Sequence, residues 1–150
     1  MTPQTARDIG VLNDVTQTLI DSHKGYETCV EAVGTNAALS KAFRDRADAR
    51  SALIREFQTA VQTLGGTPAT SGSVVGAVHR AWTSFTTLFA DDEKAAIEAV
   101  DDGEEFLAET IEDKLGDTRL MPATRELLVK AHESAREGER FADALDNALD

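Results

Sequence analysis

The chain has 150 residues, of which 41% are hydrophobic, and its 27 acidic and 15 basic residues give a formal net charge of −12. A chain of this length usually folds as one domain without help from disulfides or metals, so we expect a single domain over residues 1–150. The excess of negative charge repels phosphate backbones and anionic headgroups, which argues against nucleic acid or a membrane as the partner.

Cysteine usage and hydropathy indicate the compartment. The lone Cys29 cannot form an internal disulfide, and the first residues do not resemble a signal peptide. Charged residues interrupt every apolar cluster within a turn or two, so no stretch approaches the roughly 18 to 20 apolar residues that a membrane-spanning helix needs. We therefore expect a cytoplasmic protein that does not cross a membrane.

The first half of the chain predicts two long helices. Apolar residues recur at spacings of three and four, and Gly and Pro are confined to a few places, which favours helices and leaves no candidate strand. The first helix is predicted over residues 5–33 and the second over residues 37–64, before a Gly-Gly-Thr-Pro sequence. Long helices joined by so short a turn must be antiparallel neighbours.

The second half predicts one short and two long helices. A connection over residues 65–73 leads to a short helix over 74–89, and long helices follow over 93–115 and 122–148. A short helix between the second and third long helices can act as the crossover that distinguishes a ferritin-like bundle from an up-down-up-down bundle. The expected fold class is all-α, a ferritin-like four-helix bundle with a short crossover helix.

Three segments carry a family resemblance: Leu12-Asn13-Asp14, residues 21–26 and residues 71–82. With the helix order, they resemble a bacterial family of ferritin-like four-helix-bundle proteins of unknown function. The third segment is the most specific, beginning Ser-Gly-Ser and ending His-Arg-Ala-Trp. The resemblance implies a small cytoplasmic protein associated with stress, and it brings no established catalytic residues. His23 departs from the family pattern, because a Glu is expected at that position.

The sequence lacks the ligands of a ferritin-like di-iron centre. Such centres take one Glu from each of two helices and a Glu-x-x-His pair from each of the other two. The predicted second helix offers Asp-Ala-Arg-Ser over residues 48–51, and the last offers Arg-Glu-Gly-Glu-Arg over 136–140. Neither segment contains the pair, so we expect no catalytic residues and no metal or other cofactor, which favours a protein that is not an enzyme.

Three ionisable residues nonetheless fall on apolar helix faces, namely His23, Arg50 and Glu104. Each would be costly to bury alone, whereas together they can neutralise one another. We expect a buried salt bridge between Glu104 and Arg50, with His23 as a further partner. The alternative is a metal site, for iron, although the permanent charge of a guanidinium in the same layer would repel a cation. The candidate ligands of that alternative are His23, Glu27, Asp48, Glu104, Glu137 and Glu139.

The crossover motif offers two further candidate groups. Ser71 and Ser73 precede the predicted short helix, where they could cap it or hold an anion through free backbone amides, and capping requires less. His79 and Arg80 could face a ligand, but Trp82 fits the apolar face of that helix, which favours packing.

Two functions from different classes follow from these patterns. The first is a non-catalytic cytoplasmic bundle, associated with stress, that acts through self-association or partner binding and forms a homo-oligomer, a dimer. The alternative is a divergent ferritin-like metal-binding protein or oxidoreductase that uses His23 and Glu104.

Overall fold

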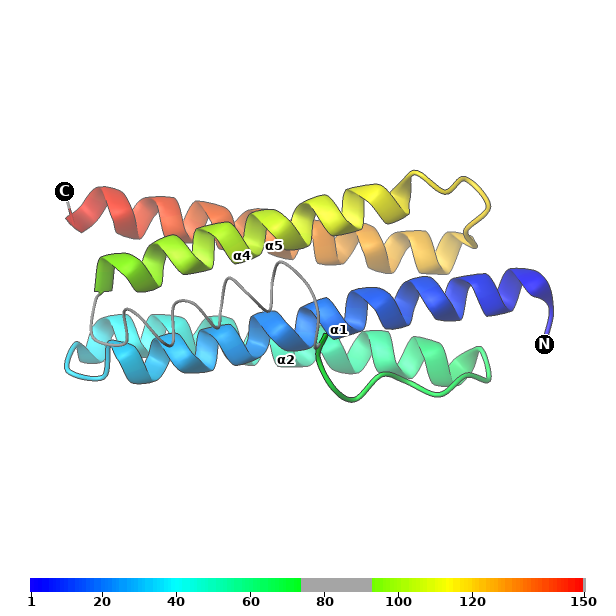
Figure 1. The fold of residues 1–150 in the computed structure, drawn as a ribbon, viewed down its shortest axis with the longest axis horizontal. Helices are drawn as coiled ribbons and strands as arrows, with labels where there is room; N and C mark the ends of the chain where they lie inside the picture. Colours follow the sequence, from blue (N-terminus) through cyan, green and yellow to red (C-terminus); the bar gives the residue numbers. More distant parts are fainter. Residues whose placement is uncertain (74–92, 150) are drawn as a thin grey trace.

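The structure is a computed structural model that describes residues 1–73 and 93–149 (Figure 1). Within these ranges the chain forms four helices and no strand, namely α1 (Pro3–Ala32), α2 (Ala37–Thr63), α4 (Glu93–Leu115) and α5 (Pro122–Leu149). The all-helical prediction is confirmed for this part of the chain, and each observed boundary lies within two residues of the predicted one. The predicted short helix, with His79, Arg80 and Trp82, lies outside the described residues.

Local capping sets where the first two helices begin. Thr2 caps α1 by accepting a hydrogen bond from the Thr5 amide at 3.1 Å, and Pro3 follows in the first turn, where its missing N–H is no loss. Asn36 caps α2 in the same way, accepting from the Leu39 amide at 3.1 Å. The prediction for α1 began two residues late because it followed the apolar stripe and overlooked this cap.

The four helices pack as two antiparallel hairpins. α1 pairs with α2 and α4 with α5, and the hairpins meet through contacts of α1 with α4 and of α2 with α5. In Figure 1, α2 ends at the right of the bundle and α4 begins at the left, so these two helices run in the same direction. The chain between them must return along the length of the bundle, which excludes a simple up-down-up-down order. None of the described helices is long and apolar enough to cross a membrane.

The buried apolar residues of the four described helices form two clusters. One lies toward the end formed by the α4–α5 turn and includes Leu12, Phe57 and Leu107. The other lies toward the end formed by the α1–α2 turn and includes Phe43 and Ile97. Along each helix a short polar interval separates the residues of the first cluster from those of the second. This interval contains the buried charges described below.

Part of the α2–α4 connection is held against α1. The side chain of Asn13 donates to the Thr67 carbonyl at 3.0 Å and accepts from the Ala69 amide at 2.8 Å. Two turns further along α1, the buried carboxylate of Asp21 accepts from the Ser73 amide at 3.1 Å. A Cβ at Gly72 would overlap Oδ1 of Asp21, so only glycine permits this close approach. Two of the three segments that carry the family resemblance thus contribute residues to the same contact.

Candidate functional site

A group of buried polar side chains lies at the middle of the bundle, and all four helices contribute to it. We call this group the central cluster. Its members are Ser22 and Tyr26 from α1, Arg46 and Arg50 from α2, Glu104 from α4 and Ser134 from α5.

The central cluster is built around a two-pronged salt bridge. Arg50 donates through one terminal nitrogen to Oε1 of Glu104 at 2.8 Å and through the other to Oε2 at 2.6 Å. Arg50 is 1% exposed and Glu104 is 0% exposed, so both charges have been removed from water. The planar guanidinium matches the carboxylate in geometry, which is the arrangement that best repays the cost of burying an ion pair.

Two further donors complete the surroundings of Glu104. The Tyr26 hydroxyl donates to Oε2 at 3.1 Å, and Arg46 donates to the same oxygen at 3.3 Å. The guanidinium of Arg46 also lies 5.7 Å from the ring centre of Tyr26 and 5.9 Å from that of Phe141, and it donates to the Ser134 carbonyl at 3.1 Å. Both carboxylate oxygens of Glu104 are therefore engaged by this chain's own donors.

Small residues make room for the ion pair. Ser22 accepts from Arg50 at 2.6 Å, and the Ser134 hydroxyl lies 3.4 Å from the other terminal nitrogen of Arg50. Gly138 faces Glu104 from α5, and a Cβ at this position would overlap the carboxylate. Within the central cluster, the Nε of Arg50 is the one buried side-chain nitrogen that finds no acceptor among the described residues.

The central cluster carries more positive than negative charge, because two guanidinium groups face one carboxylate. Burial by itself lowers the pKa of Arg50, but the charge and hydrogen bonds of Glu104 outweigh this effect, so the net shift is upward. Burial, followed by the charge of Glu104, raises the pKa of Tyr26 well above its usual value of 10.0. The phenol is therefore protonated and able to donate at neutral pH, where Arg50 is charged.

The structure brings together two of the three residues expected at the centre. Arg50 and Glu104 are in contact, whereas His23 is not part of the central cluster. The His23 side chain is 27% exposed, and its Nδ1 lies 3.2 Å from the carboxylate of Glu27, one turn further along α1. The expectation that His23 is a partner of the salt bridge is therefore wrong. Ser22 and Tyr26, on either side of it in sequence, contact the salt bridge instead.

The candidate ligands of the metal alternative do not converge. Glu27 is exposed and beside His23, Asp48 and Glu137 are exposed, and Glu139 is bound by Arg136 at 2.8 Å. Within residues 1–73 and 93–149, no three His, Cys, Asp or Glu side chains are grouped so that they could hold a metal ion. Glu104, the one candidate in the centre, already binds two cationic side chains.

Four members of the central cluster were missed in the sequence, and weak signals existed for some of them. Arg46 precedes Arg50 by one helical turn, so both arginines lie on one side of α2 and can reach the same carboxylate. Tyr26 was assigned to the apolar stripe, correctly for its ring, but a buried phenol also needs a hydrogen-bond partner. Nothing in the sequence distinguishes Ser22 or Ser134 from the other serines on helix surfaces.

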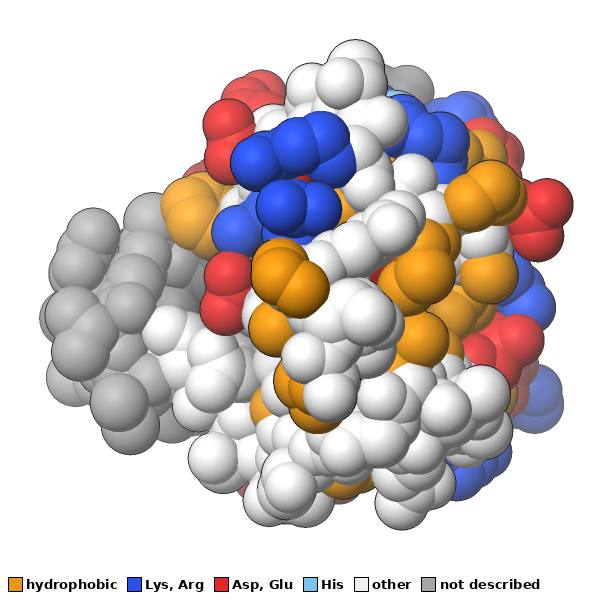
Figure 2. All heavy atoms as spheres, turned by 90° about the vertical axis from the view of Figure 1, so that its right-hand side faces the viewer, with side chains coloured by type: hydrophobic (Ala, Val, Ile, Leu, Met, Phe, Trp, Pro, Cys, Tyr) orange, Lys and Arg blue, Asp and Glu red, His pale blue; other side chains and the backbone are white. Residues whose placement is uncertain are grey.

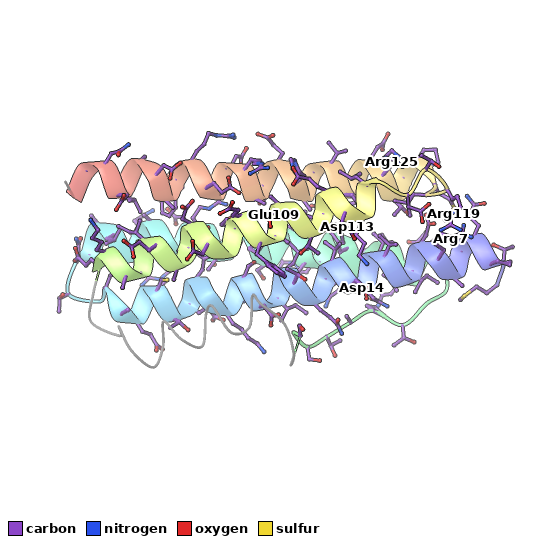
Figure 3. The ribbon with its side chains drawn as sticks, turned by 45° about the horizontal axis from the view of Figure 1, so that its top comes forward. Arg7, Asp14, Glu109, Asp113, Arg119 and Arg125 are labelled. Carbon is purple, nitrogen blue, oxygen red and sulfur yellow. The ribbon has the colours of Figure 1, made fainter. Side chains whose placement is uncertain are left out.

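A second group of charged residues lies at the end of the bundle formed by the α4–α5 turn, where Figure 3 shows Arg7, Arg119 and Arg125. Arg125 donates to the carbonyls of Leu115 at 3.1 Å and Asp117 at 2.6 Å. These hydrogen bonds supply partners for backbone carbonyl groups at the C-terminal end of α4, which have none within the helix. Arg119 binds both carboxylate oxygens of Asp117 at 3.0 Å and lowers the pKa of that carboxyl to about 2. Arg119 and Arg125 are thus occupied in shaping the turn.

Ser71 and Ser73 lie in the connection that packs on α1. The amide of Ser73 donates to Asp21, so an acidic side chain lies where an anion would have to bind. The short helix that Ser71 and Ser73 were expected to cap lies outside the described residues.

Comparison with known proteins gives a family but no activity. A family model described as a domain of unknown function (DUF2383) matches residues 8–117. The match includes the residues of the central cluster on α1, α2 and α4 but not Ser134 or Gly138 on α5. No curated protein and no solved structure matches the chain.

Proposed function

We propose that this chain, which belongs to the DUF2383 family of unknown function, is a non-catalytic helical-bundle protein that acts by association. One observation carries the proposal. The one carboxylate of the central cluster, Glu104, binds Arg50 through both of its oxygens and Arg46 through one. A side chain held in this way cannot serve as a free base, nucleophile or ligand without breaking a buried salt bridge.

The chemistry of the central cluster does not fit a di-iron site. Bridging metals require several carboxylates to neutralise them, whereas the central cluster has one carboxylate and two permanently charged guanidinium groups. Its other donors are a buried phenol and two serine hydroxyls. No observation favours the alternative of a metal-binding protein or oxidoreductase, and we infer no step through a metal.

The arrangement of the helices supports a ferritin-like bundle in which residues 74–89 form a crossover helix. α2 and α4 run in the same direction and need a long return between them, which is the feature that defines this topology. The family resemblance further supports a cytoplasmic location and an association with stress. In this proposal the chain has the ferritin-like fold, but a structural ion pair occupies the centre of its bundle in place of a metal site.

Association is proposed to occur first with a second copy of the chain, giving a homodimer. Long amphipathic helices that present an incompletely covered face commonly pair in this way. Sedimentation velocity at protein concentrations from about 1 to about 100 μM tests the proposal, because dimers with micromolar dissociation constants form within that range. A dimer of twice the chain mass is expected. A monomer throughout, together with an enzymatic turnover abolished by Glu104→Gln, would contradict the proposal.

A further inference from the structure

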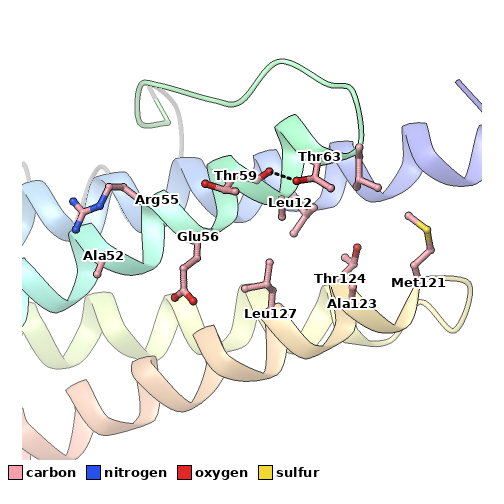
Figure 4. A pocket seen from close by; sticks show the side chains of 12 residues that line it. Leu12, Ala52, Arg55, Glu56, Thr59, Thr63, Met121, Ala123, Thr124 and Leu127 are labelled. Atoms are coloured by element: carbon pink, nitrogen blue, oxygen red, sulfur yellow. Dashed lines mark hydrogen bonds between the residues drawn. The ribbon is translucent and has the colours of Figure 1, made fainter.

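A segment of irregular chain, residues 67–73, lies across α1 and α2 after α2 ends, and we call it the strap. It contains no helix or strand and no charged residue. Its first residues bond to Asn13 and its last to Asp21, so it runs alongside α1 in the same direction. In Figure 4 the strap passes above α1 and α2 on the side away from α5, apart from the groove between α2 and α5.

The strap is extended and rests on the surface. Gly66 lies against Ile9 and Ser73 bonds to Asp21, so the chain follows α1 over about 18 Å between these two points. The same stretch as a helix would cover only about 10 Å. Pro68 favours an extended backbone at its own position and at the residue before it. No residue of the strap is fully buried.

The helices bind the backbone of the strap at its middle. Asn13 of α1 donates to the Thr67 carbonyl and accepts from the Ala69 amide, and Gln58 of α2 donates to the Ala69 carbonyl at 3.0 Å. Ala69 is thus bound from both helices through its backbone alone. Such groups are present in any polypeptide, and main-chain hydrogen bonds are a common source of affinity for extended peptides.

Side chains of the strap take little part in its binding. The hydroxyl groups of Thr67, Thr70 and Ser71 have no hydrogen-bond partner within residues 1–73 and 93–149. Gly72 is the exception, because a Cβ there would overlap the Asp21 carboxylate. The face under the strap therefore selects an extended backbone with glycine at one position.

We propose that this face of α1 and α2 is a binding site for an extended peptide segment of a partner protein, and that the strap is its resident occupant. The partner segment presents its backbone to Asn13, Gln58 and Asp21, with a glycine beside Asp21. It needs no charge, since charged side chains gather in the upper part and at the right of Figure 2, whereas the strap runs along the lower edge of Figure 1. This inference goes beyond the homodimer proposed above and does not depend on it.

The tethered strap competes with any such partner, at an effective concentration on the order of millimolar. A synthetic peptide of residues 64–73, blocked at both ends, serves as the probe and is added to the intact ¹⁵N-labelled chain. Binding is followed through the NMR signals of the Asn13 and Gln58 side-chain amides. Gly72→Ala loosens the resident strap and is expected to bind the peptide roughly tenfold tighter than the wild type. Gly10→Ala is the matched control and should bind like the wild type, because its Cβ meets nothing within 4 Å.

Variants of the peptide test whether the backbone is what is recognised. A peptide in which Thr67, Thr70 and Ser71 are all replaced by Ala should bind the Gly72→Ala protein as well as the original peptide does. A peptide that itself carries Gly72→Ala should bind at least about tenfold more weakly. Asn13→Ala, added to the Gly72→Ala protein, should weaken binding similarly because it removes a donor and an acceptor.

Thermal melts show whether each variant is folded, and protease cleavage within residues 67–73 shows whether the strap is released. If Gly72→Ala does not fold, Ala69→Pro takes its place, since proline removes the amide that donates to Asn13. A folded variant with a released strap that does not bind the peptide would overturn the inference. So would loss of binding when the hydroxyl side chains of the peptide are removed. A strap as protected in Gly72→Ala as in Gly10→Ala would remove the contact from which the site was inferred.

Discussion

Glu104 shows how a buried charge is tolerated at the scale of a single residue. The residue is 0% exposed, and its carboxylate accepts hydrogen bonds from Arg50, Arg46 and Tyr26. Such a pair adds little stability over a well-packed apolar core, but removing one partner leaves an uncompensated charge in a low-dielectric interior. The contribution of the pair therefore appears only when its two members are changed separately and together.

The first prediction concerns Arg50→Met, which keeps much of the side-chain volume and removes the charge. We expect a loss of about 3 to 5 kcal/mol in the free energy of unfolding, because Glu104 remains buried with only Arg46 as its cation. Combining it with Glu104→Leu should cost clearly less than the sum of the single changes. Urea unfolding of the four proteins in this cycle, with Arg44→Met as an exposed control, gives the coupling. Strict additivity would show that the two side chains do not interact in solution.

The second prediction concerns Asp101, one helical turn before Glu104. Burial, followed by the charges of Asp143 and Glu139, raises the pKa of Asp101 from 3.8 to about 6. The folded state thus binds the proton more tightly than the unfolded state, so this residue makes folding more favourable as the pH falls from about 6 toward 3.8. At pH 7 its charge is unfavourable, and Asp101→Asn should stabilise the protein by about 1 kcal/mol, a value reduced for partial exposure to solvent.

The comparison is made by thermal melts of wild type and Asp101→Asn between pH 7 and pH 4. The advantage of the variant should be largest at pH 7 and should shrink as the wild-type side chain becomes protonated. Asp102→Asn, one residue away and exposed, provides the control. An advantage of Asp101→Asn that grew toward pH 4 would contradict the assigned shift.

At the scale of helices, the spacing of residues predicted where the long helices begin and end. It was less reliable in predicting which face of a helix a given residue lies on. Gly and Pro positions placed the four long helices to within two residues, because these residues act locally. The positions of Arg50 and Glu104 on the apolar faces of their helices predicted that both side chains point into the bundle. His23 was misassigned because it lies at the margin of the α1 stripe, where a small error in phase decides between core and surface. The three-dimensional contacts of Arg46 and Ser134 depend on how helices pack, which no single-helix pattern contains.

The connection after α2 could not be placed from the sequence. Ser71 and Ser73 were interpreted as candidate caps of a short helix that lies outside the described residues. The contacts of Gly72 and of the Ser73 amide with the Asp21 carboxylate were not predicted. The partner lies about fifty residues earlier in the chain, and a single sequence carries no record of such a contact. Asn13 acts in the same way and was noticed only through family resemblance.

The third prediction concerns Gly72→Ala, which places a methyl group on the Asp21 carboxylate. We expect a loss of about 1 to 2 kcal/mol and faster protease cleavage within residues 65–73, because the connection must move away from α1. Gly10→Ala is the matched control, since nothing lies within 4 Å of a Cβ at that position, and Ala there should stabilise α1 slightly. Equal behaviour of the two variants would show that the connection does not pack on Asp21.

At the scale of the whole molecule, the interior of the bundle differs from its α2–α5 face. Its interior is closed by an ion pair to which all four helices contribute, directly or through a neighbouring side chain, and a groove of about 620 Å³ lies between α2 and α5. The centre of this four-helix bundle is a structural cross-link between helices, built from Arg50 and Glu104. In the proposed function, association takes place through the outer faces of the bundle.

Aerobic titration of the purified protein with Fe(II), followed by absorption spectroscopy and thermal melting, tests most directly whether the centre is a structural ion pair. Both oxygens of Glu104 are bound by Arg50, and the excess positive charge repels a cation, so we expect no ligand-to-metal absorption band. Iron should change the melting temperature of the wild type no more than that of Glu104→Ala, each compared with its own iron-free sample. Stoichiometric iron binding with a thermal shift that disappears in Glu104→Ala would contradict a structural role for the central cluster and would restore the metal-binding alternative.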